Sequence, residues 1–231
     1  MAHPAESSSG GGPETTARYV APFALFLLFL GLQYLNLFPL RVYFALWVVA
    51  LAAILFFYSR PVIRLKPNRL IPSLLLGVAV FVIWIGPDEL FPAWRHHWLF
   101  HNVLTGGGNG SLPAALRGDA LLLTLRVLRA VAIVPIVEEL FWRGWLMRWL
   151  IDADFRRVPF GTYAPLSFWV TALMFASEHG PYWDVGLIAG IAYNWWAIRT
   201  KSLADCILAH AVTNGVLCVW VIAAGHWEYW L

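Results

Sequence analysis

Runs of about 20 apolar residues recur along this chain, and they constrain its fold more than any other feature. A helix needs about 20 such residues to cross a hydrocarbon core about 30 Å thick. Only 13% of the 231 residues are charged and 60% are hydrophobic, whereas an ordinary soluble domain is about 25% charged. A large soluble core could also be apolar, but it would not space its charges in this way. The sequence therefore predicts an all-α fold, a polytopic transmembrane helix bundle of about seven or eight helices.

Seven stretches are apolar enough to be spans, and an eighth stretch has a different character. The seven lie at about residues 20–38, 42–58, 70–86, 130–150, 164–179, 184–199 and 202–224. The eighth, 114–129, places Arg126 and Arg129 on one helix face. It is predicted to be either an amphipathic helix at the membrane interface or the first part of a long bent helix. Pro135 allows a kink just before a pair of glutamates.

The sequence predicts a polar N-terminal tail followed by one membrane domain. Residues 1–17 are polar and rich in serine and glycine, so we expect a disordered tail there. Residues 18–231 should form a single integral membrane domain, because no internal repeat and no second folded domain is evident.

Basic residues in the connections predict the orientation in the membrane. One side collects Arg60, Arg64, Lys66, Arg69, Arg148, Arg156, Arg157, Arg199 and Lys201, and the other only Arg41, Arg95 and Arg117. The N-terminus is therefore expected in the cytoplasm and the C-terminus outside, in a bacterial inner (plasma) membrane. This bias explains the net charge of +3. No basic patch suggests a nucleic-acid partner.

Two adjacent glutamates, Glu138 and Glu139, lie inside one of the apolar spans. An ionisable group at this depth costs roughly 2.5–3.5 kcal/mol, so it indicates a function. Glu139 and Arg143 are four residues apart, so they should pair on one side of the helix and brace it. Glu138 points about 100° away around the helix. It is either a general base or a protonated glutamate bonded to a neighbouring helix, and its spacing leaves both open.

Three more polar residues, His179, His210 and Asn214, fall in predicted spans. His179 could share a water with a carboxylate or be a hydrogen-bonded packing residue. His210 and Asn214 are four apart and project to one side, so they could hold an oxyanion or clamp two helices. At about 1.5 Å per residue from the predicted cytoplasmic ends, Glu138, His179 and His210 share one layer near the midplane. Polar residues that only joined separate pairs of helices would not need to lie at the same depth in the membrane.

Three motifs resemble those of the CAAX prenyl protease type II and bacteriocin-processing (CPBP, or Abi) family of intramembrane endopeptidases. The family pattern is Glu-Glu-x-x-x-Arg, then Phe-x-x-x-His, then His-x-x-x-Asn. Here it reads Glu138-Glu139-Leu140-Phe141-Trp142-Arg143, Phe175-Ala176-Ser177-Glu178-His179 and His210-Ala211-Val212-Thr213-Asn214. The resemblance covers about residues 115–225, the expected catalytic core. The first three spans match only as generic membrane helices.

The resemblance implies an endopeptidase that acts on a membrane-associated or C-terminally processed protein. Glu138 and His179 would activate a water, His210 and Asn214 would form the oxyanion hole, and Glu139 and Arg143 would brace the helix. Family members have been called metalloproteases, and Glu138, His179 and His210 could form a three-ligand zinc site. The sequence has no His-Glu-x-x-His, so we favour a glutamate mechanism without a metal or other cofactor.

A narrower resemblance is to CAAX-protease-related proteins of bacterial exosortase sorting systems, which suggests such a system as a possible partner. It is carried by Phe160-Gly161-Thr162, Ala192-Tyr193-Asn194-Trp195 and Arg199-Thr200-Lys201-Ser202-Leu203. The expected partners otherwise are membrane lipids and a peptide or protein substrate. The main alternative is a non-catalytic membrane protein on the same scaffold, which binds a peptide or confers immunity. A proton-coupled transporter is a second alternative, but it commonly shows two related halves, which this chain lacks.

Overall fold

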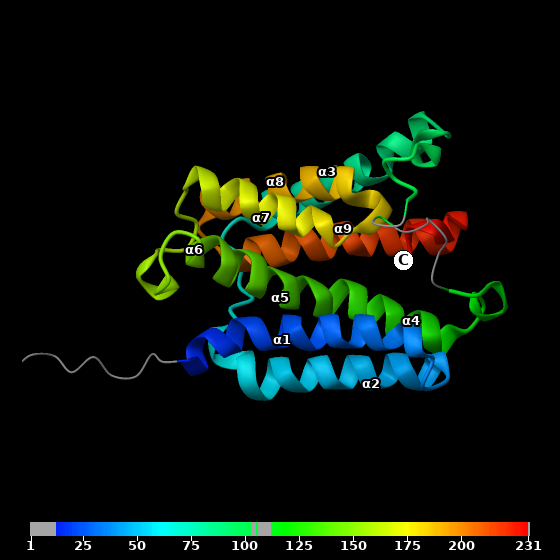
Figure 1. Ribbon diagram of the computed structural model, residues 1–231, viewed down its shortest axis with the longest axis horizontal. Helices are drawn as coiled ribbons and strands as arrows, with labels where there is room; N and C mark the ends of the chain where they lie inside the picture. Colours follow the sequence, from blue (N-terminus) through cyan, green and yellow to red (C-terminus); the bar gives the residue numbers. More distant parts are fainter. Residues whose placement is uncertain (1–12, 103–104, 106–111, 231) are drawn as a thin grey trace, which may run out of the picture.

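A computed structural model describes residues 13–102, 105 and 112–230 of the chain. Within this part the protein is a bundle of seven helices (Figure 1). They are α1 (Pro13–Leu32), α2 (Leu40–Ala53, continued by a π-helical stretch Ile54–Ser59), α3 (Leu70–Leu90), the long helix Ala120–Trp149, α7 (Pro165–Ser177), α8 (Trp183–Thr200) and α9 (Leu203–Ala224). The seven predicted spans each correspond to one of these helices, which confirms the predicted all-helical bundle.

Five of these helices are long and apolar enough to cross a membrane. They span Thr15–Leu35, Leu40–Val62, Leu70–Leu90, Ala120–Trp149 and Leu203–Ala224, and α7 is a shorter apolar helix. Their outer faces carry large exposed apolar side chains, including Val49, Phe57, Leu75 and Trp169. A surface of this kind suits hydrocarbon rather than water. The chain is therefore an integral membrane protein.

The long helix Ala120–Trp149 resolves the two predictions for residues 114–129. It consists of α4 (Ala120–Leu128), a π-helical stretch Arg129–Ile133, α5 (Val134–Glu139), a second π-helical stretch Leu140–Leu146 and α6 (Met147–Trp149). Residues 120–129 are thus the first part of a long helix and not a separate interfacial one, while residues 114–116 form a short 3-10 turn before it. Asp119 caps its first turn by accepting a hydrogen bond from Leu122 N, 3.1 Å away. Arg41 also donates to this carboxylate and so lowers the pKa of Asp119.

The N-terminal boundary differs from the prediction of a tail over residues 1–17. Residues 1–12 lie outside the described residues, but helix α1 already begins at Pro13, so residues 13–17 are helical. A proline fits the first position of a helix because its missing N–H would have no intrahelical partner there.

Consecutive helices alternate in direction, so the basic connections meet at one end of the bundle. The connections 60–69, 150–164 and 201–202 lie on the left of Figure 1, beside the N-terminal side of α1. The connections 33–39, 91–119 and 178–182 lie at the opposite end, together with the last residues of the chain. The charge asymmetry predicted from the sequence is therefore an asymmetry between the two ends of the folded molecule.

A glycine allows α3 and α9 to pack closely, which fixes the helix that carries His210. A Cβ atom at Gly77 would lie 2.5 Å from the carbonyl oxygen of Ala209 and 2.6 Å from Cβ of Val212. No other residue type fits at this contact without moving a backbone. Next to it, Oγ1 of Thr213 lies 2.8 Å from the carbonyl oxygen of Gly77. The contact turns the opposite face of α9 toward the bundle interior.

The start of α3 is held by a buried carboxylate from α9. Oδ1 of Asp205 accepts hydrogen bonds from Arg69 N (2.7 Å) and Ser73 Oγ (2.8 Å), and Oδ2 accepts one from Asn68 N (2.7 Å). Asn68 and Arg69 directly precede Leu70, the first residue of α3, so these bonds tie the beginning of α3 to α9 and pair donors that would otherwise lack a protein partner.

We expect Asp205→Ala to lower the thermal stability of the purified protein, because it leaves these donors unsatisfied. The expected loss is about 2 kcal/mol or more. Thermal unfolding followed by intrinsic fluorescence would measure it, with Asp152→Ala in the exposed connection after α6 as the control. Equal melting temperatures for the two variants would contradict the role assigned to Asp205.

Candidate active site within the bundle

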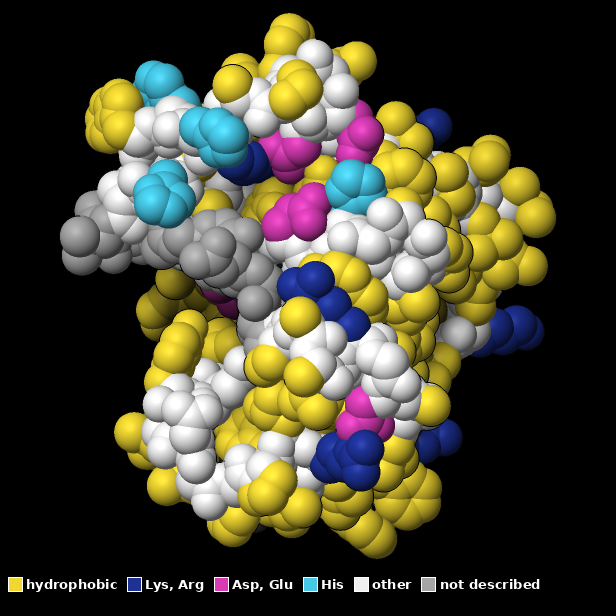
Figure 2. All heavy atoms as spheres, turned by 90° about the vertical axis from the view of Figure 1, so that its right-hand side faces the viewer, with side chains coloured by type: hydrophobic (Ala, Val, Ile, Leu, Met, Phe, Trp, Pro, Cys, Tyr) yellow, Lys and Arg dark blue, Asp and Glu magenta, His cyan; other side chains and the backbone are white. Residues whose placement is uncertain are grey.

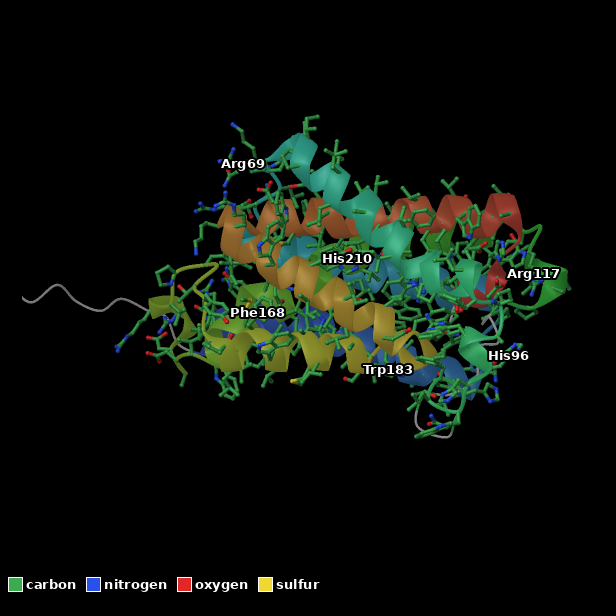
Figure 3. All side chains as sticks on the ribbon, turned by 90° about the horizontal axis from the view of Figure 1, so that it is seen from above. Arg69, His96, Arg117, Phe168, Trp183 and His210 are labelled. Atoms are coloured by element: carbon green, nitrogen blue, oxygen red, sulfur yellow. The ribbon has the colours of Figure 1, made fainter. Side chains whose placement is uncertain are left out.

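The predicted site residues line one cavity of about 830 Å³ inside the bundle. Glu138, His179, His210 and Asn214 all contribute to its wall, with an aromatic lining that includes Trp47, Trp84, Phe175, Tyr182 and Tyr193. Figure 3 shows His210 about midway along the molecule, between Arg69 near one end and Arg117 near the other. The structure therefore brings residues from three separate helical segments to one space at mid-depth.

The cavity runs from these residues toward the end of the bundle that carries the connection 91–119. Its wall there includes Gln33 and Tyr34 after α1 and Tyr229 after α9, and Tyr34 is 81% exposed. Figure 2 looks onto this end, where histidine, acidic and basic side chains lie among apolar ones. The active-site candidates thus have access to the surface at the end opposite the basic connections.

Glu138 and Glu139 contact the same histidine from α9. Nδ1 of His210 lies 3.0 Å from Oε1 of Glu139, and Nε2 lies 3.8 Å from Oε2 of Glu138. Oε2 of Glu138 is buried and has no hydrogen-bond partner among the described residues. Oε2 of Glu139 also lacks a partner among the described residues, but only Glu138 lines the cavity. The two glutamates therefore differ in role: Glu139 orients the imidazole, and Glu138 presents an unpaired oxygen to the cavity.

The expected Glu139–Arg143 ion pair is present and fully buried. Nη1 of Arg143 donates to Oε1 of Glu139 at 2.9 Å, and neither side chain is exposed. Nε of Arg143 also donates to Oδ1 of Asn194 (2.9 Å), and Nη2 donates to the carbonyl oxygen of Gly190 (3.2 Å). The guanidinium thus joins the glutamate helix to α8. Asn194 was not predicted, because an amide in an apolar helix gives no spacing signal of its own.

Asn194 extends this connection to a third helix. Its Nδ2 donates to the carbonyl oxygen of Phe168 in α7 at 2.8 Å. The chain Glu139–Arg143–Asn194 therefore holds together the long helix, α8 and α7, the three elements that position Glu138 and His179. Removal of one member would leave a buried charge or amide without its partner, which is costly.

His179 is held at the end of α7 in a defined tautomer. Its Nδ1 lies 2.7 Å from the carbonyl oxygen of Phe175, and a carbonyl can only accept, so Nδ1 carries the proton. Nε2 is then left with a free lone pair. The indole of Trp84 meets the imidazole edge-on with ring centroids 5.2 Å apart. His179 is therefore a neutral acceptor in a fixed orientation.

The amide of Asn214 is oriented by a carbonyl that proline sets free. In the π-helical stretch Arg129–Ile133, the N–H of Val134 bonds the carbonyl of Arg129, and Pro135 has no N–H to offer. The carbonyl of Ala130 therefore lacks its helical partner and accepts from Nδ2 of Asn214 at 2.9 Å. Pro135 thus disturbs the helix where a kink was predicted. The second N–H of the Asn214 amide remains available to the cavity.

Glu178 is a cavity residue that the sequence analysis missed. Its Oε1 accepts from Nε1 of Trp142 at 3.0 Å, and its side chain lines the cavity. Neighbouring residues of a helix point about 100° apart, so Glu178 and His179 would not face one space in a continued α7. The helix ends at Ser177, and the turn that follows brings both side chains inward. The inward direction of Glu178 would have been predictable only if the last residue of α7 had been known.

One group of described side chains has the spacing of a metal site. One ligand atom each from Glu138, Glu178 and His179 lies within 4.8 Å of the others. Two carboxylates and an imidazole with a free lone pair suit zinc with an open position. The set differs from the predicted one, because Glu178 replaces His210, whose Nδ1 is occupied by Glu139. The donor set therefore fits a metal chemically, although it lacks the sequence pattern of a zinc peptidase.

Comparison with known proteins adds one finding. Residues 120–216, which include Glu138, His179, His210 and Asn214, match the family described as Rce1-like, type II CAAX prenyl endopeptidase. No curated protein and no solved structure matches the chain.

Proposed function

We propose that Glu138 and its neighbours hydrolyse a peptide bond inside the cavity, because residues 120–216 match the family described as Rce1-like, type II CAAX prenyl endopeptidase. The substrate in this proposal is a membrane-associated or C-terminally processed protein. The observation that carries the proposal is the unpaired Oε2 of Glu138, which faces a cavity shared with His179, His210 and Asn214.

Glu138 and His179 are suited to hold the attacking water between them. Both Oε2 of Glu138 and Nε2 of His179 can accept a hydrogen bond from one water molecule. As the water oxygen bonds to the carbonyl carbon, Glu138 takes its proton. The proton then passes to the nitrogen of the leaving amine as the C–N bond breaks. The products are a new carboxylate and a free amine.

His210 and Asn214 are suited to stabilise the oxyanion that forms on the carbonyl oxygen. Asn214 has one amide N–H left after its bond to Ala130. Nδ1 of His210 donates to Glu139, so Nε2 donates only when the imidazole is doubly protonated. The Glu139 carboxylate balances the charge of that imidazolium. In this proposal Glu139 therefore serves the oxyanion site as well as the ion pair with Arg143.

A metal-independent mechanism predicts that chelators leave activity intact. Bacterial membranes containing the active protein would be incubated with and without 1,10-phenanthroline, and the peptides released would be compared by mass spectrometry. We expect the same cleavage products under both conditions. Loss of the products with chelator, restored by added zinc, would instead assign the water to a metal.

Glu178→Gln provides the matched variant for that experiment. Without a metal, Glu178 only borders the water site, so we expect cleavage to fall by no more than about tenfold, or about 1.4 kcal/mol. If Glu138, Glu178 and His179 hold zinc, the substitution removes a ligand, and both the bound zinc and the activity should be lost.

The family match favours catalysis over a non-catalytic peptide-binding or immunity protein. The location of the protein follows from its basic connections: we propose a bacterial inner membrane with the N-terminus in the cytoplasm. In that orientation the cavity opens at the extracytoplasmic end. The family match identifies no exosortase-type partner, so that association stays a prediction from the narrower resemblance.

A further inference from the structure

The wall of the active-site cavity also carries two arginines that the proposed reaction does not use. Arg126 and Arg129 both line the cavity, on the stretch of the long helix between Asp119 and Glu138. They are three residues apart, which places their side chains on the same face. Two cations therefore lie side by side on an otherwise largely aromatic and aliphatic wall.

Arg129 is held by aromatic rings and not by an acid. Its Cζ lies 3.9 Å from the ring centroid of Trp47 and 4.8 Å from that of Phe44. Its Nε and Nη1 are buried and have no hydrogen-bond partner among the described residues. None of the ion pairs formed within the described part of the chain involves Arg129.

An anion in the cavity would complete this arrangement. A buried guanidinium with unsatisfied N–H groups is unfavourable, and its planar fork matches a carboxylate in two parallel hydrogen bonds. The stacking on Trp47 and Phe44 holds the plane of that fork while leaving its N–H edge for a ligand. Arg126 is stacked in a similar way on Phe44 and Trp230, with Cζ 5.1 Å and 4.9 Å from the two centroids.

The position of Arg129 relative to Glu138 sets a length for the ligand. The two residues are nine positions apart on one continuous helix, which is about 13 Å at 1.5 Å per residue. An extended peptide advances about 3.3–3.6 Å per residue, so about four residues cover the same distance. A carboxylate at Arg129 would therefore place a peptide bond about four residues upstream next to Glu138.

We propose that Arg129, with Arg126 beside it, binds the free C-terminal carboxylate of the peptide substrate. The enzyme would then measure its cleavage site from the end of the chain and release a short peptide of about four residues. The place of the scissile bond rests on the proposed function, but binding of the carboxylate does not require cleavage. A lipid phosphate shares the same chemistry, and the continuity of these arginines with the cavity that holds Glu138 favours the peptide.

Binding of two matched probes tests this subsite without relying on activity. The probes are a fluorescein-labelled apolar hexapeptide with a free C-terminal carboxylate and the same peptide with a C-terminal amide. The full-length protein in neutral detergent would carry Glu138→Gln throughout, so that hydrolysis does not consume the probes. Fluorescence anisotropy gives the two dissociation constants, and we expect the acid to bind about tenfold or more tightly than the amide.

Arg129→Gln should remove this preference and leave amide binding unchanged. Arg129→Lys keeps the charge and should retain part of the preference, which covers the case in which the glutamine variant does not fold. Arg148→Gln is the control, because Arg148 lies on the same long helix, stacks on Phe155 and does not line the cavity. We expect it to keep the full preference.

Three results would overturn the subsite: no tighter binding of the acid, no detectable binding of it, or a preference that survives in Arg129→Gln. Displacement of the acid by phosphatidylglycerol but not by phosphatidylcholine would assign the arginines to a lipid headgroup and would also overturn it. A Glu138 variant that still cleaves substrate would refute the proposed reaction and leave this binding result standing.

Discussion

Glu138→Gln should abolish peptide hydrolysis while leaving the folded protein unchanged. Glutamine has nearly the same shape as glutamate but cannot take a proton from water, and general-base catalysis contributes about 10²–10⁴-fold to a rate. Oε2 of Glu138 has no hydrogen-bond partner among the described residues, so the substitution breaks no described bond at that atom. The measurement is the rate of release of a substrate peptide by purified protein in lipid vesicles.

Glu89→Gln is the matched control for this substitution. Glu89 is partly exposed near the end of α3 and does not line the cavity, so we expect its variant to cleave at the wild-type rate. Equal melting temperatures would show that neither substitution alters folding. Full activity of the Glu138 variant would refute the assignment of Glu138 as the base.

Arg143→Ala should have its largest effect on folding rather than on chemistry. It leaves the buried carboxylate of Glu139 without its counter-charge and removes the donors to Asn194 and Gly190. Breaking a buried ion pair in this way costs about 3–5 kcal/mol. We expect a strongly reduced yield of folded protein and a lower melting temperature, measured against Arg157→Ala in the exposed connection after α6.

The double variant Glu139→Gln/Arg143→Gln separates charge from packing. It removes both charges together, so it should recover part of the stability that Arg143→Ala loses. Its hydrolysis should stay low even in the folded fraction, because Glu139 also orients His210. Wild-type stability of Arg143→Ala would contradict the bracing role.

The helix bundle was predictable because hydrocarbon leaves little choice of structure. Apolar runs predicted all seven helices, although only five of them are long and apolar enough to cross a membrane. The spacing of polar residues predicted the Glu139–Arg143 pair. The approach of Glu138 to His210 followed from their common depth. These features depend on the period and length of helices, which a sequence displays directly.

The rest of the site depends on places where helices stop being regular. Glu178 enters the cavity because α7 ends at Ser177, and Asn214 is oriented because a π-helical stretch frees the carbonyl of Ala130. The choice between an interfacial helix and a long bent one for 114–129 depended on tertiary packing. The spacing of polar and apolar residues predicts a side-chain direction only within an uninterrupted helix. It therefore cannot show where a helix ends or becomes irregular.

The proposed oxyanion site depends on Pro135, a residue of a different helix from the one that carries Asn214. The direction of the Asn214 amide is set by the backbone carbonyl of Ala130 in another helix. That carbonyl has no helical partner because Pro135, five positions farther along, has no N–H. In the proposed reaction, Pro135 thereby orients the amide that would hold the oxyanion, although Pro135 itself is not among the residues that line the cavity. Relatives of this protein that move the proline by one position would have to find a different anchor for the asparagine, or orient the amide from the opposite wall.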